Sequence, residues 1–191
     1  MILDYKNDLD FACENGISIH KLSKDKCFIY FNKDKKGEKY SEIIFKNFPN
    51  LYMADSKFEK CVFENCGDVE FSKCKVEESV FESTTIHGIR SDFYNSEFKN
   101  IEADGLSALL IDTDGEVIGC KFENVVAKGD EGRVCYMVVD KEKDMQYLVD
   151  CKFINCSVEA ADGSLSLCNY RSLLGKQKYV ENIDYDSCEI V

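Results

Sequence analysis

The sequence of 191 residues contains no tryptophan, a single proline and only two histidines, His20 and His87. A zinc site built from cysteine and histidine would have almost no imidazole to use, and the cysteine spacings match no zinc pattern. No apolar run approaches the roughly 18 residues that a membrane-spanning helix needs. We therefore expect no metal site, no cofactor and no membrane association.

The first residues, MILDYKNDLDF, lack the basic region and the apolar core of a secretory signal. We therefore expect a cytoplasmic protein with reduced thiols. The eleven cysteines are odd in number and form no Cys-x-x-Cys pair. We interpret them as small buried apolar side chains rather than as a disulfide framework.

Basic residues are scarce relative to acidic ones: 24 Lys and Arg stand against 36 Asp and Glu, a formal net charge of −12. Such a surface repels the nucleic-acid backbone and anionic membranes over most of its area. We therefore predict no direct nucleic-acid binding. The charge suits solubility or a basic partner.

The chain does contain a recurring motif of six residues. Its form is a small residue, any residue, Phe, any residue, Asn or Ser, and then Cys, Thr or an aliphatic residue. The copies at 61–66, 79–84, 96–101, 120–125 and 151–156 supply the predicted structural positions Cys61, Phe63, Asn65, Phe81, Phe98, Asn100, Cys120, Phe122, Asn124, Cys151, Phe153 and Asn155.

Each position of the motif has a physical interpretation. The small residue and Phe are two apart, so in a strand they face the same side, while the Lys or Glu between them faces solvent. By the same alternation Asn belongs to the inward set. Asn also tolerates the left-handed region and suits a tight corner. Strand, Asn corner and strand together are typical of a coil of short parallel strands.

Equivalent positions of successive coils should stack about 4.8 Å apart. This predicts a stack of phenylalanines, a ladder of Asn side chains and an inner row of thiols. The Phe-to-Phe spacings of 18, 17, 24 and 31 residues indicate loops that lengthen toward the C-terminus. A second frame runs through Val76, so the phase between residues 66 and 90 stays open. Apolar stretches at 106–111, 134–139 and 165–170 predict further strands.

A repeat of this period predicts a solenoid. Residues 51–108 resemble pentapeptide-repeat proteins, whose five-residue unit has a small residue two places before a central Phe or Leu. The central positions that fit are Phe58, Phe63, Phe71, Val76, Phe81, Ile86, Phe93 and Phe98, with a slip of frame after Phe63 and after Ile86. Residues 96–191 look more like the right-handed parallel β-helix of pectate-lyase-like and autotransporter passenger proteins, the resemblance that we favour overall.

The resemblance implies an all-β, single-domain, right-handed parallel β-helix. We expect residues 1–50 to form an N-terminal cap with the first strands, and residues 51–191 to form the coils. Within the cap, the sequence predicts a strand at 27–31, a lysine-rich turn and a strand at 40–45.

Candidate catalytic groups are scattered. As the resemblance implies, β-helix enzymes that act on polysaccharides gather carboxylates on one sheet. The carboxylates beside glycine or in polar turns are Asp104, Asp112, Asp114, Asp130, Glu131, Asp184 and Asp186. Cysteine catalysis would need His87 near Cys66 or Cys74, or His20 near Cys13 or Cys27, yet buried repeat thiols are inert. We predict no catalytic residue, and a carbohydrate-active or carbohydrate-binding β-helix is the alternative.

We therefore predict a non-enzymatic scaffold or inhibitor that binds another protein. The excursions at 126–133, 140–147 and 171–186 would emerge from the later coils, and recognition often resides in loops on a rigid frame. The candidate binding surface consists of Tyr136, Tyr147, Tyr170, Tyr179, Asp130 and Glu131.

Two further hypotheses concern the partner. Pentapeptide-repeat proteins include acidic rods that mimic DNA, so the resemblance also implies an acidic inhibitor of a DNA-binding protein. Lysines interrupt the acidic stripe of Glu59, Glu64, Glu70, Glu77, Glu78 and Glu82, however. A poorly capped C-terminal coil would also permit a homodimer joined end to end.

Overall fold

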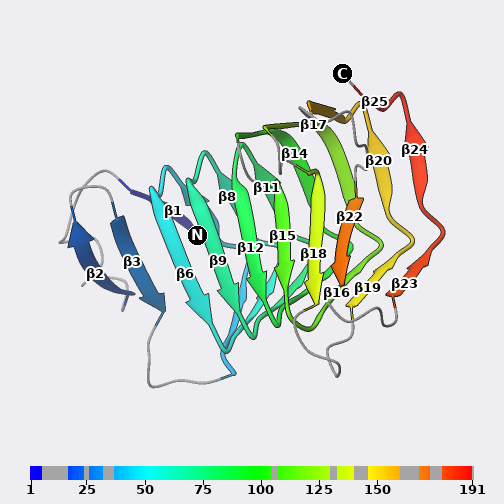
Figure 1. The fold of residues 1–191 in the computed structure, drawn as a ribbon. Coiled ribbons are helices and arrows are strands. Elements are labelled where there is room, and N and C mark those ends of the chain that lie inside the picture. Colours follow the sequence, from blue (N-terminus) through cyan, green and yellow to red (C-terminus); the bar gives the residue numbers. More distant parts are fainter. Residues whose placement is uncertain are drawn as a thin grey trace.

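The structure is a computed structural model, and every regular element among the residues that it describes is a β-strand. It describes residues 1–5, 17–23, 26–31, 37–104, 107–129, 133–139, 146–159, 168–172 and 178–190. Within these residues the strands form three parallel sheets around one core and a two-stranded hairpin near the N-terminus (Figure 1). No helix among the described residues is long and apolar enough to cross a membrane.

We number the sheets in the order in which each coil visits them. Sheet 1 contains β4 (Lys39–Ser41), β7 (Lys57–Glu59), β10 (Lys75–Glu77), β13 (Asp92–Tyr94), β16 (Gly115–Ile118), β19 (Gln146–Val149) and β23 (Lys178–Glu181). Sheet 2 contains β1 (Ile2–Asp4), β5 (Ile44–Lys46), β8 (Val62–Glu64), β11 (Val80–Glu82), β14 (Glu97–Asp104), β17 (Lys121–Lys128), β20 (Lys152–Ile154), β21 (Ser157–Glu159), β24 (Asp184–Asp186) and β25 (Glu189–Ile190). Sheet 3 contains β6 (Asn50–Ala54), β9 (Asp68–Ser72), β12 (Thr85–Ile89), β15 (Leu109–Asp112), β18 (Cys135–Val139) and β22 (Cys168–Ser172).

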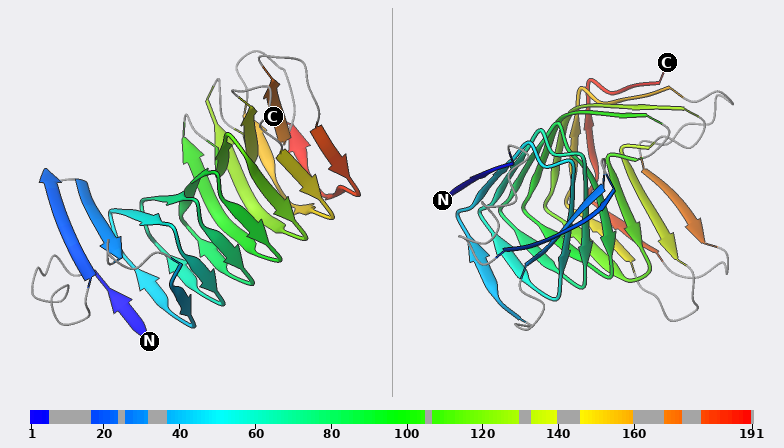
Figure 2. Two further views of the ribbon diagram at one scale, coloured as in Figure 1. Left: turned by 90° about the horizontal axis from the view of Figure 1, so that it is seen from below. Right: turned by 90° about the vertical axis from the view of Figure 1, so that its left-hand side faces the viewer.

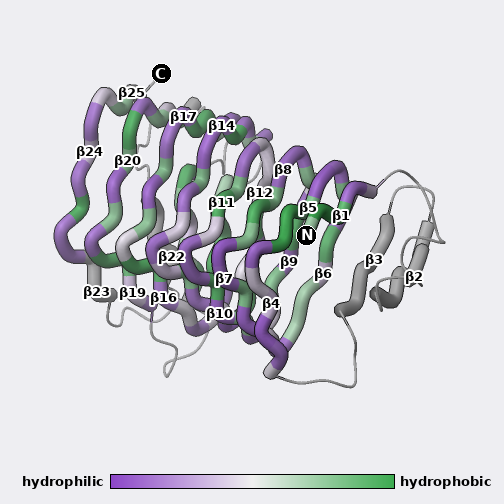
Figure 3. Tube along the Cα trace, turned by 180° about the vertical axis from the view of Figure 1, so that it is seen from behind, coloured by the Kyte–Doolittle hydropathy of each residue, from purple (hydrophilic) through white to green (hydrophobic). Residues whose placement is uncertain are grey.

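The chain passes from sheet 1 to sheet 2 to sheet 3 and then returns to sheet 1 one strand further along. In Figure 1 it descends along sheet 3 at the front, and in Figure 3 sheets 1 and 2 are seen from behind. Descent at the front and ascent at the back, combined with advance from left to right, make the coil right-handed. The predicted right-handed parallel β-helix is therefore confirmed, and Figure 2 shows the stacked coils from two further sides.

The register of the strands resolves the phase that the sequence left open. Phe81 pairs with Phe63 and with Phe98 in sheet 2. Val76 pairs with Phe58 and with Phe93 in sheet 1. The frame through Val76 is thus a second stack on a second side of the same coil, not a competing alignment.

Sheet 3 explains why the five-residue frame slips. Its strand β9 has two inward side chains, Val69 and Phe71, whereas each three-residue strand of sheets 1 and 2 has one. The strand β12 repeats this arrangement with Ile86 and Gly88. The early coils therefore have pentapeptide-repeat character on two sides and a longer strand on the third.

The phenylalanine stack runs through the core along sheet 2, as predicted. Its rings are nearly parallel, with centroid distances of 4.7 Å (Phe45–Phe63), 4.9 Å (Phe63–Phe81), 5.0 Å (Phe81–Phe98), 4.7 Å (Phe98–Phe122) and 4.6 Å (Phe122–Phe153). Tyr185 continues the stack at 5.4 Å from Phe153. Each ring is held by contacts with the coils before and after it, so the stack fixes the register along the whole solenoid.

The Asn corners are confirmed, but one part of their prediction is wrong. Asn65, Asn100, Asn124 and Asn155 have φ of 51°, 53°, 53° and 50°, in the left-handed region. Asn155 Nδ2 donates to Asn124 Oδ1 (2.7 Å), and Asn124 Nδ2 donates to Asn100 Oδ1 (3.1 Å), which is the predicted ladder. These side chains are exposed rather than inward, because the left-handed residue interrupts the alternation of the strand.

Of the described thiols, all are buried as predicted except that of Cys188, which is half-buried, and they do not form a single row. Cys61, Cys120 and Cys151 occupy the corner between sheets 1 and 2, Cys66 the corner between sheets 2 and 3, and Cys74 the corner between sheets 3 and 1. Cys156 and Cys188 lie between consecutive strands of sheet 2, and Cys135 lies in β18 of sheet 3. Burial raises the pKa of Cys66 to about 11 and that of Cys74 to about 12. These thiols are protonated at neutral pH and serve as packing groups.

The N-terminal region differs from its prediction in its pairing. The strands predicted at 27–31 and 40–45 exist but belong to different sheets: β3 (Lys26–Phe31) pairs with β2 (Ile17–Ser23), and β4 and β5 belong to the coils. The physical reason is core burial, since Phe45 stacks on Phe63 and Tyr40 on Phe58. The hairpin β2–β3 lies beside β6 at the start of sheet 3 (Figure 1).

Candidate protein-binding surface

The structure divides the four predicted tyrosines between two sheets. Tyr147 in β19 and Tyr179 in β23 are register partners on sheet 1. Tyr136 in β18 and Tyr170 in β22 both belong to sheet 3. The four therefore do not form a single row.

The two tyrosines of sheet 3 are also out of register with each other. Tyr136 is half-buried and pairs with Asn169, whereas Tyr170 pairs with the buried Met137. Asp130 and Glu131 lie outside the described residues, so their place in a binding surface stays a prediction. Of the predicted candidates, the structure brings Tyr147 and Tyr179 into one row.

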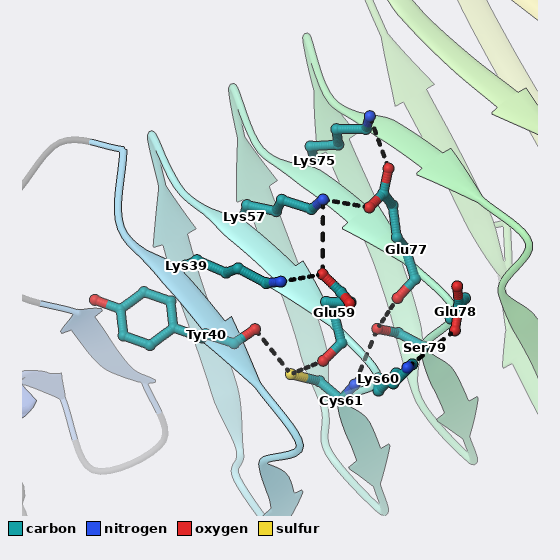
Figure 4. A network of polar contacts seen from close by, with 10 residues as sticks. All are labelled: Lys39, Tyr40, Lys57, Glu59, Lys60, Cys61, Lys75, Glu77, Glu78 and Ser79. Atoms are coloured by element: carbon teal, nitrogen blue, oxygen red, sulfur yellow. Dashed lines mark hydrogen bonds and ion pairs between the residues drawn. The ribbon is translucent and has the colours of Figure 1, made fainter.

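The outer face of sheet 1 begins as a ladder of opposite charges (Figure 4). Lys39 Nζ lies 2.5 Å from Glu59 Oε2, and Lys57 reaches both Glu59 (3.7 Å) and Glu77. Lys75 Nζ lies 2.7 Å from Glu77 Oε1. The lysine partners lower the pKa of both carboxyl groups, Glu59 and Glu77. This half of the face is occupied by its own ion pairs, which interrupt the acidic stripe that a DNA mimic would need.

Tyr94 marks the end of the ladder. The ammonium of Lys75 lies 4.6 Å from the centre of its ring, a cation–π contact. The Tyr94 hydroxyl donates to Glu116, whose backbone N–H donates to Asp92 Oδ1 at 3.1 Å. Burial raises the pKa of Tyr94 and of Asp92. The tyrosine is thus held in place with its ring on the outer face.

Beyond Tyr94 the outer face changes its chemistry. Ile118 pairs in register with Tyr94 on one side and with Val149 on the other, and Tyr147 stands two residues before Val149. All four side chains alternate with inward neighbours and are half-buried. We call Tyr94, Ile118, Tyr147 and Val149 the sheet 1 patch.

Sequence reasoning identified Tyr147 but missed the other three members of the sheet 1 patch. The available signal was alternation: Val117 and Leu148 are inward, so the residues beside them had to be outward. What the sequence could not supply was the register that joins Ile118 to Val149 across a loop.

The predicted excursions are partly wrong, because residues 126–128 belong to β17, residues 146–147 to β19, and residues 178–181 and 184–186 to β23 and β24. Two of these regions still enter sheet 1 next to this patch. Residues 140–145 connect β18 to β19, and residues 173–177 connect β22 to β23. In the early coils the same corner takes only two residues, Lys73 and Cys74, between β9 and β10. The chain is therefore lengthened at the corner that leads into the patch.

The candidate catalytic carboxylates are dispersed over the fold. Asp104 ends β14 in sheet 2, Asp112 ends β15 in sheet 3, Asp114 follows it in a turn, and Asp184 and Asp186 lie in the last coil. No three or more His, Cys, Asp or Glu side chains of the described residues are arranged to hold a metal ion.

Cysteine chemistry finds no support at His87. Its side chain lies on the outer face of sheet 3, with Nε2 4.0 Å from Asp112 Oδ2. Cys66 and Cys74 are buried in the core, on the opposite side of the coil backbone from the His87 side chain. The side chains of His20, Cys13 and Cys27 lie outside the described residues.

Comparisons with known proteins add little to this geometry. No family model matches the chain, and no curated protein sequence matches it significantly. Two solved structures of trypsin-treated variants of QnrB1, a plasmid-mediated fluoroquinolone resistance protein, align with this chain. The first is 9% identical over 80% of this chain and 84% of its own, with a TM-score of 0.19. The second is 12% identical over 78% of this chain and 92% of its own, with a TM-score of 0.18. A likeness this weak carries no argument. The pentapeptide-repeat character rests on the register and spacing described above, and nothing in the comparisons supports the pectate-lyase-like resemblance.

Proposed function

We propose that this protein is a scaffold that binds another protein through the sheet 1 patch. The observation that carries the proposal is the change along a single outer face, from paired charges to aromatic and aliphatic side chains, at β13. Packing of the stacked coils explains why the inward side chains are apolar. It does not require apolar side chains on the outer face of sheet 1. A centre of aromatic and aliphatic side chains with charges around it is typical of protein interfaces.

The frame suits this role because it is already ordered. Successive strands of a parallel sheet present their side chains about 4.8 Å apart on a surface that does not have to fold on binding. Preorganisation lowers the entropy lost on association. Asp92 and Glu116 flank the patch, and Glu181 pairs in register with Val149. These acids favour a partner whose apolar contact residues are surrounded by basic ones.

Binding by such a face would act through occlusion, as a scaffold or an inhibitor, without chemistry on the partner. We infer a non-enzymatic role because the described candidate carboxylates are spread over separate sheets and coils. The cytoplasmic location expected from the sequence belongs to the same proposal.

The test is capture of partners by the full chain and two charged variants. Ile118→Lys with Val149→Lys puts two ammonium groups into the patch. Val62→Lys with Val80→Lys is the matched control, because these valines are also half-buried, outward and in register, but on sheet 2. We expect proteins captured by the wild type and by the control to be reduced more than tenfold on the patch variant, a loss of at least about 1.4 kcal/mol. Circular dichroism verifies that all three proteins are folded.

Equal capture by both variants would contradict the sheet 1 patch. The alternatives have their own signatures. A captured DNA-binding protein that is displaced by duplex DNA and kept by the patch variant would favour the acidic DNA mimic. Cleavage or retention of soluble polysaccharides, with no protein captured, would favour a carbohydrate-active or carbohydrate-binding β-helix.

A further inference from the structure

The cysteines of the early coils have hydroxyl neighbours in the next coil. Each cysteine backbone N–H donates to a Ser or Thr side chain of the following coil: Cys61 to Ser79 (3.1 Å), Cys66 to Thr84 (3.1 Å) and Cys74 to Ser91 (3.0 Å). The thiols of these three residues therefore have no cysteine on the side of the following coil.

In the later coils, cysteine stands beside cysteine. Lys121 pairs with Lys152, so Cys120 and Cys151, each one residue earlier, are neighbours across the coils. Ser157 pairs with Glu189 in the same way, which makes neighbours of Cys156 and Cys188. A third pair, Cys135 and Cys168, is in direct register in sheet 3.

The spacing of such neighbours is compatible with a disulfide. Residues in register on adjacent parallel strands lie about 4.8 Å apart. The Cα atoms of a disulfide are usually separated by about 4.4–6.8 Å. The thiols of Cys156 and Cys188 also interact electrostatically. Burial is the main cause of the raised pKa of Cys156, and the neighbouring Cys188 raises it further.

Accessibility distinguishes the pair of Cys156 and Cys188 from the pair of Cys120 and Cys151. Cys120, Cys151 and Cys156 are each 1% exposed, whereas Cys188 is half-buried in the last coil. Every residue of β24, just before Cys188, is exposed. A dissolved reagent can therefore reach Cys188 without prior unfolding of the core.

We propose that Cys156 and Cys188 form a disulfide when the protein meets an oxidised low-molecular-weight disulfide such as glutathione disulfide. The Cys188 thiolate attacks one sulfur of that reagent, its S–S bond breaks, and one glutathione leaves. The Cys156 thiolate, having lost its proton to solvent, then attacks the Cys188 sulfur and displaces the second glutathione. Two protein thiols are oxidised, and one glutathione disulfide is reduced to two glutathiones.

The second step should be the slow one. Burial raises the pKa of Cys156 to about 11, so little thiolate forms until the last coil opens. The bridge would close the long connection of residues 157–187, and a cross-link constrains the unfolded chain more when its loop is longer. Oxidation would thus fasten the last coil to the coil before it, and reduction would release it.

The experiment uses the full reduced chain, incubated with glutathione disulfide and then blocked with an alkylating reagent. Digestion with trypsin and a Glu-specific protease cleaves after Lys152, Glu159 and Glu181, so Cys156 (153–159), Cys168 (160–171) and Cys188 (182–189) fall in separate peptides. We expect mass spectrometry to find 153–159 linked to 182–189, with two glutathiones released for each link. Hydrogen exchange in β24 should slow at least tenfold and recover on reduction.

Three variants make the result decisive. Cys188→Ser should abolish the link, and Cys156→Ser should stop the reaction at a stable glutathione adduct on Cys188. Cys61→Ser, at a buried cysteine with a hydroxyl neighbour, should leave the link unchanged. A wild-type protein that retains glutathione on Cys188 with Cys156 still reduced would overturn the proposal. Linkage of Cys120 to Cys151 as fast as that of Cys156 to Cys188 would overturn it as well.

Discussion

At the scale of the residue, the solenoid depends on single corner residues in the left-handed conformation. Most of them carry a side chain: φ is 54° at Lys60, 49° at Arg90 and 53° at Asn124. This region is unfavourable for L-residues by about 1–2 kcal/mol, least so for Asn. Backbone hydrogen bonds to the next coil hold these corners, as when the N–H of Asn65 donates to the Glu82 carbonyl at 3.0 Å.

The corner at Asn124 yields a direct prediction. Asn124→Val should destabilise the fold by about 2 kcal/mol, because a β-branched residue fits poorly at a φ of 53°. Asn124→Gly should change stability by less than about 1 kcal/mol, since glycine adopts this conformation readily. Urea unfolding of both variants measures the difference. Glu123→Val controls for the loss of polarity, because residue 123 is extended within β17 and β-branched residues suit strands. Equal losses for Val and Gly at residue 124 would contradict the argument.

At the scale of the element, no strand is stable by itself. The strands of sheet 1 in the early coils have three residues each, and their outward charges pair across coils. Such exposed pairs contribute little individually. In register, like charges stand directly opposite each other, Lys57 opposite Lys75 and Glu59 opposite Glu77. The diagonal pairs, such as Lys57 with Glu77, therefore offset a repulsion that the register itself creates.

The Lys–Glu ladder of sheet 1 predicts a pH dependence. Because the folded-state pKa of Glu59 and of Glu77 is lowered, their stabilising effect is present above the ordinary carboxyl pKa near 4.3 and is lost as pH falls through the lowered value. The wild type should therefore exceed Glu59→Gln with Glu77→Gln in stability at pH 7, and this advantage should disappear toward about pH 3. Urea unfolding at both pH values measures it. High salt should reduce the advantage at pH 7, and an advantage that grows on acidification would refute the assignment.

At the scale of the whole molecule, the fold is a one-dimensional stack whose ends differ from its middle. A central strand such as β11 has sheet partners on both sides, whereas β24 ends the described order of sheet 2. Phe81, in β11, is fully buried, and Tyr185, in β24, is 52% exposed. Stability in such stacks is the sum of contributions from each coil and its interfaces, so it should fall toward an uncovered end.

Hydrogen exchange of the reduced protein should show this gradient. Amides of β8, β11 and β14 should be protected by several orders of magnitude more than those of β24. Exchange read out by mass spectrometry on peptides from each coil measures the profile. Uniform protection from β5 to β24 would contradict a coil-by-coil stability and would indicate that the last coil is covered.

Much of this protein could be predicted from the sequence, because a repeat with period-two alternation states which side chains face inward. The stack of Phe63, Phe81, Phe98 and Phe122, the Asn corners and the right-handed β-helix all follow from residue spacing and the resemblance based on it. The predicted strands at 106–111 and 134–139 correspond to β15 and β18.

The candidate site was much less predictable. Tyr147 could be singled out as an aromatic residue beside a loop, but its neighbours on the outer face could not. The outward direction of the Asn side chains was also missed, since alternation fails at a left-handed residue.

By itself, then, the sequence determined which residues of the solenoid pack in the core and which face of each strand is exposed to solvent. These properties depend on distances of two to five residues along the chain. Only the tertiary structure decided which outward and corner residues are neighbours, such as Ile118 with Val149 or Cys156 with Cys188. The physical reason is that those pairs are 31 and 32 residues apart in the chain, and the connections between them are irregular in length. Only the stacking of one coil on the next fixes their register.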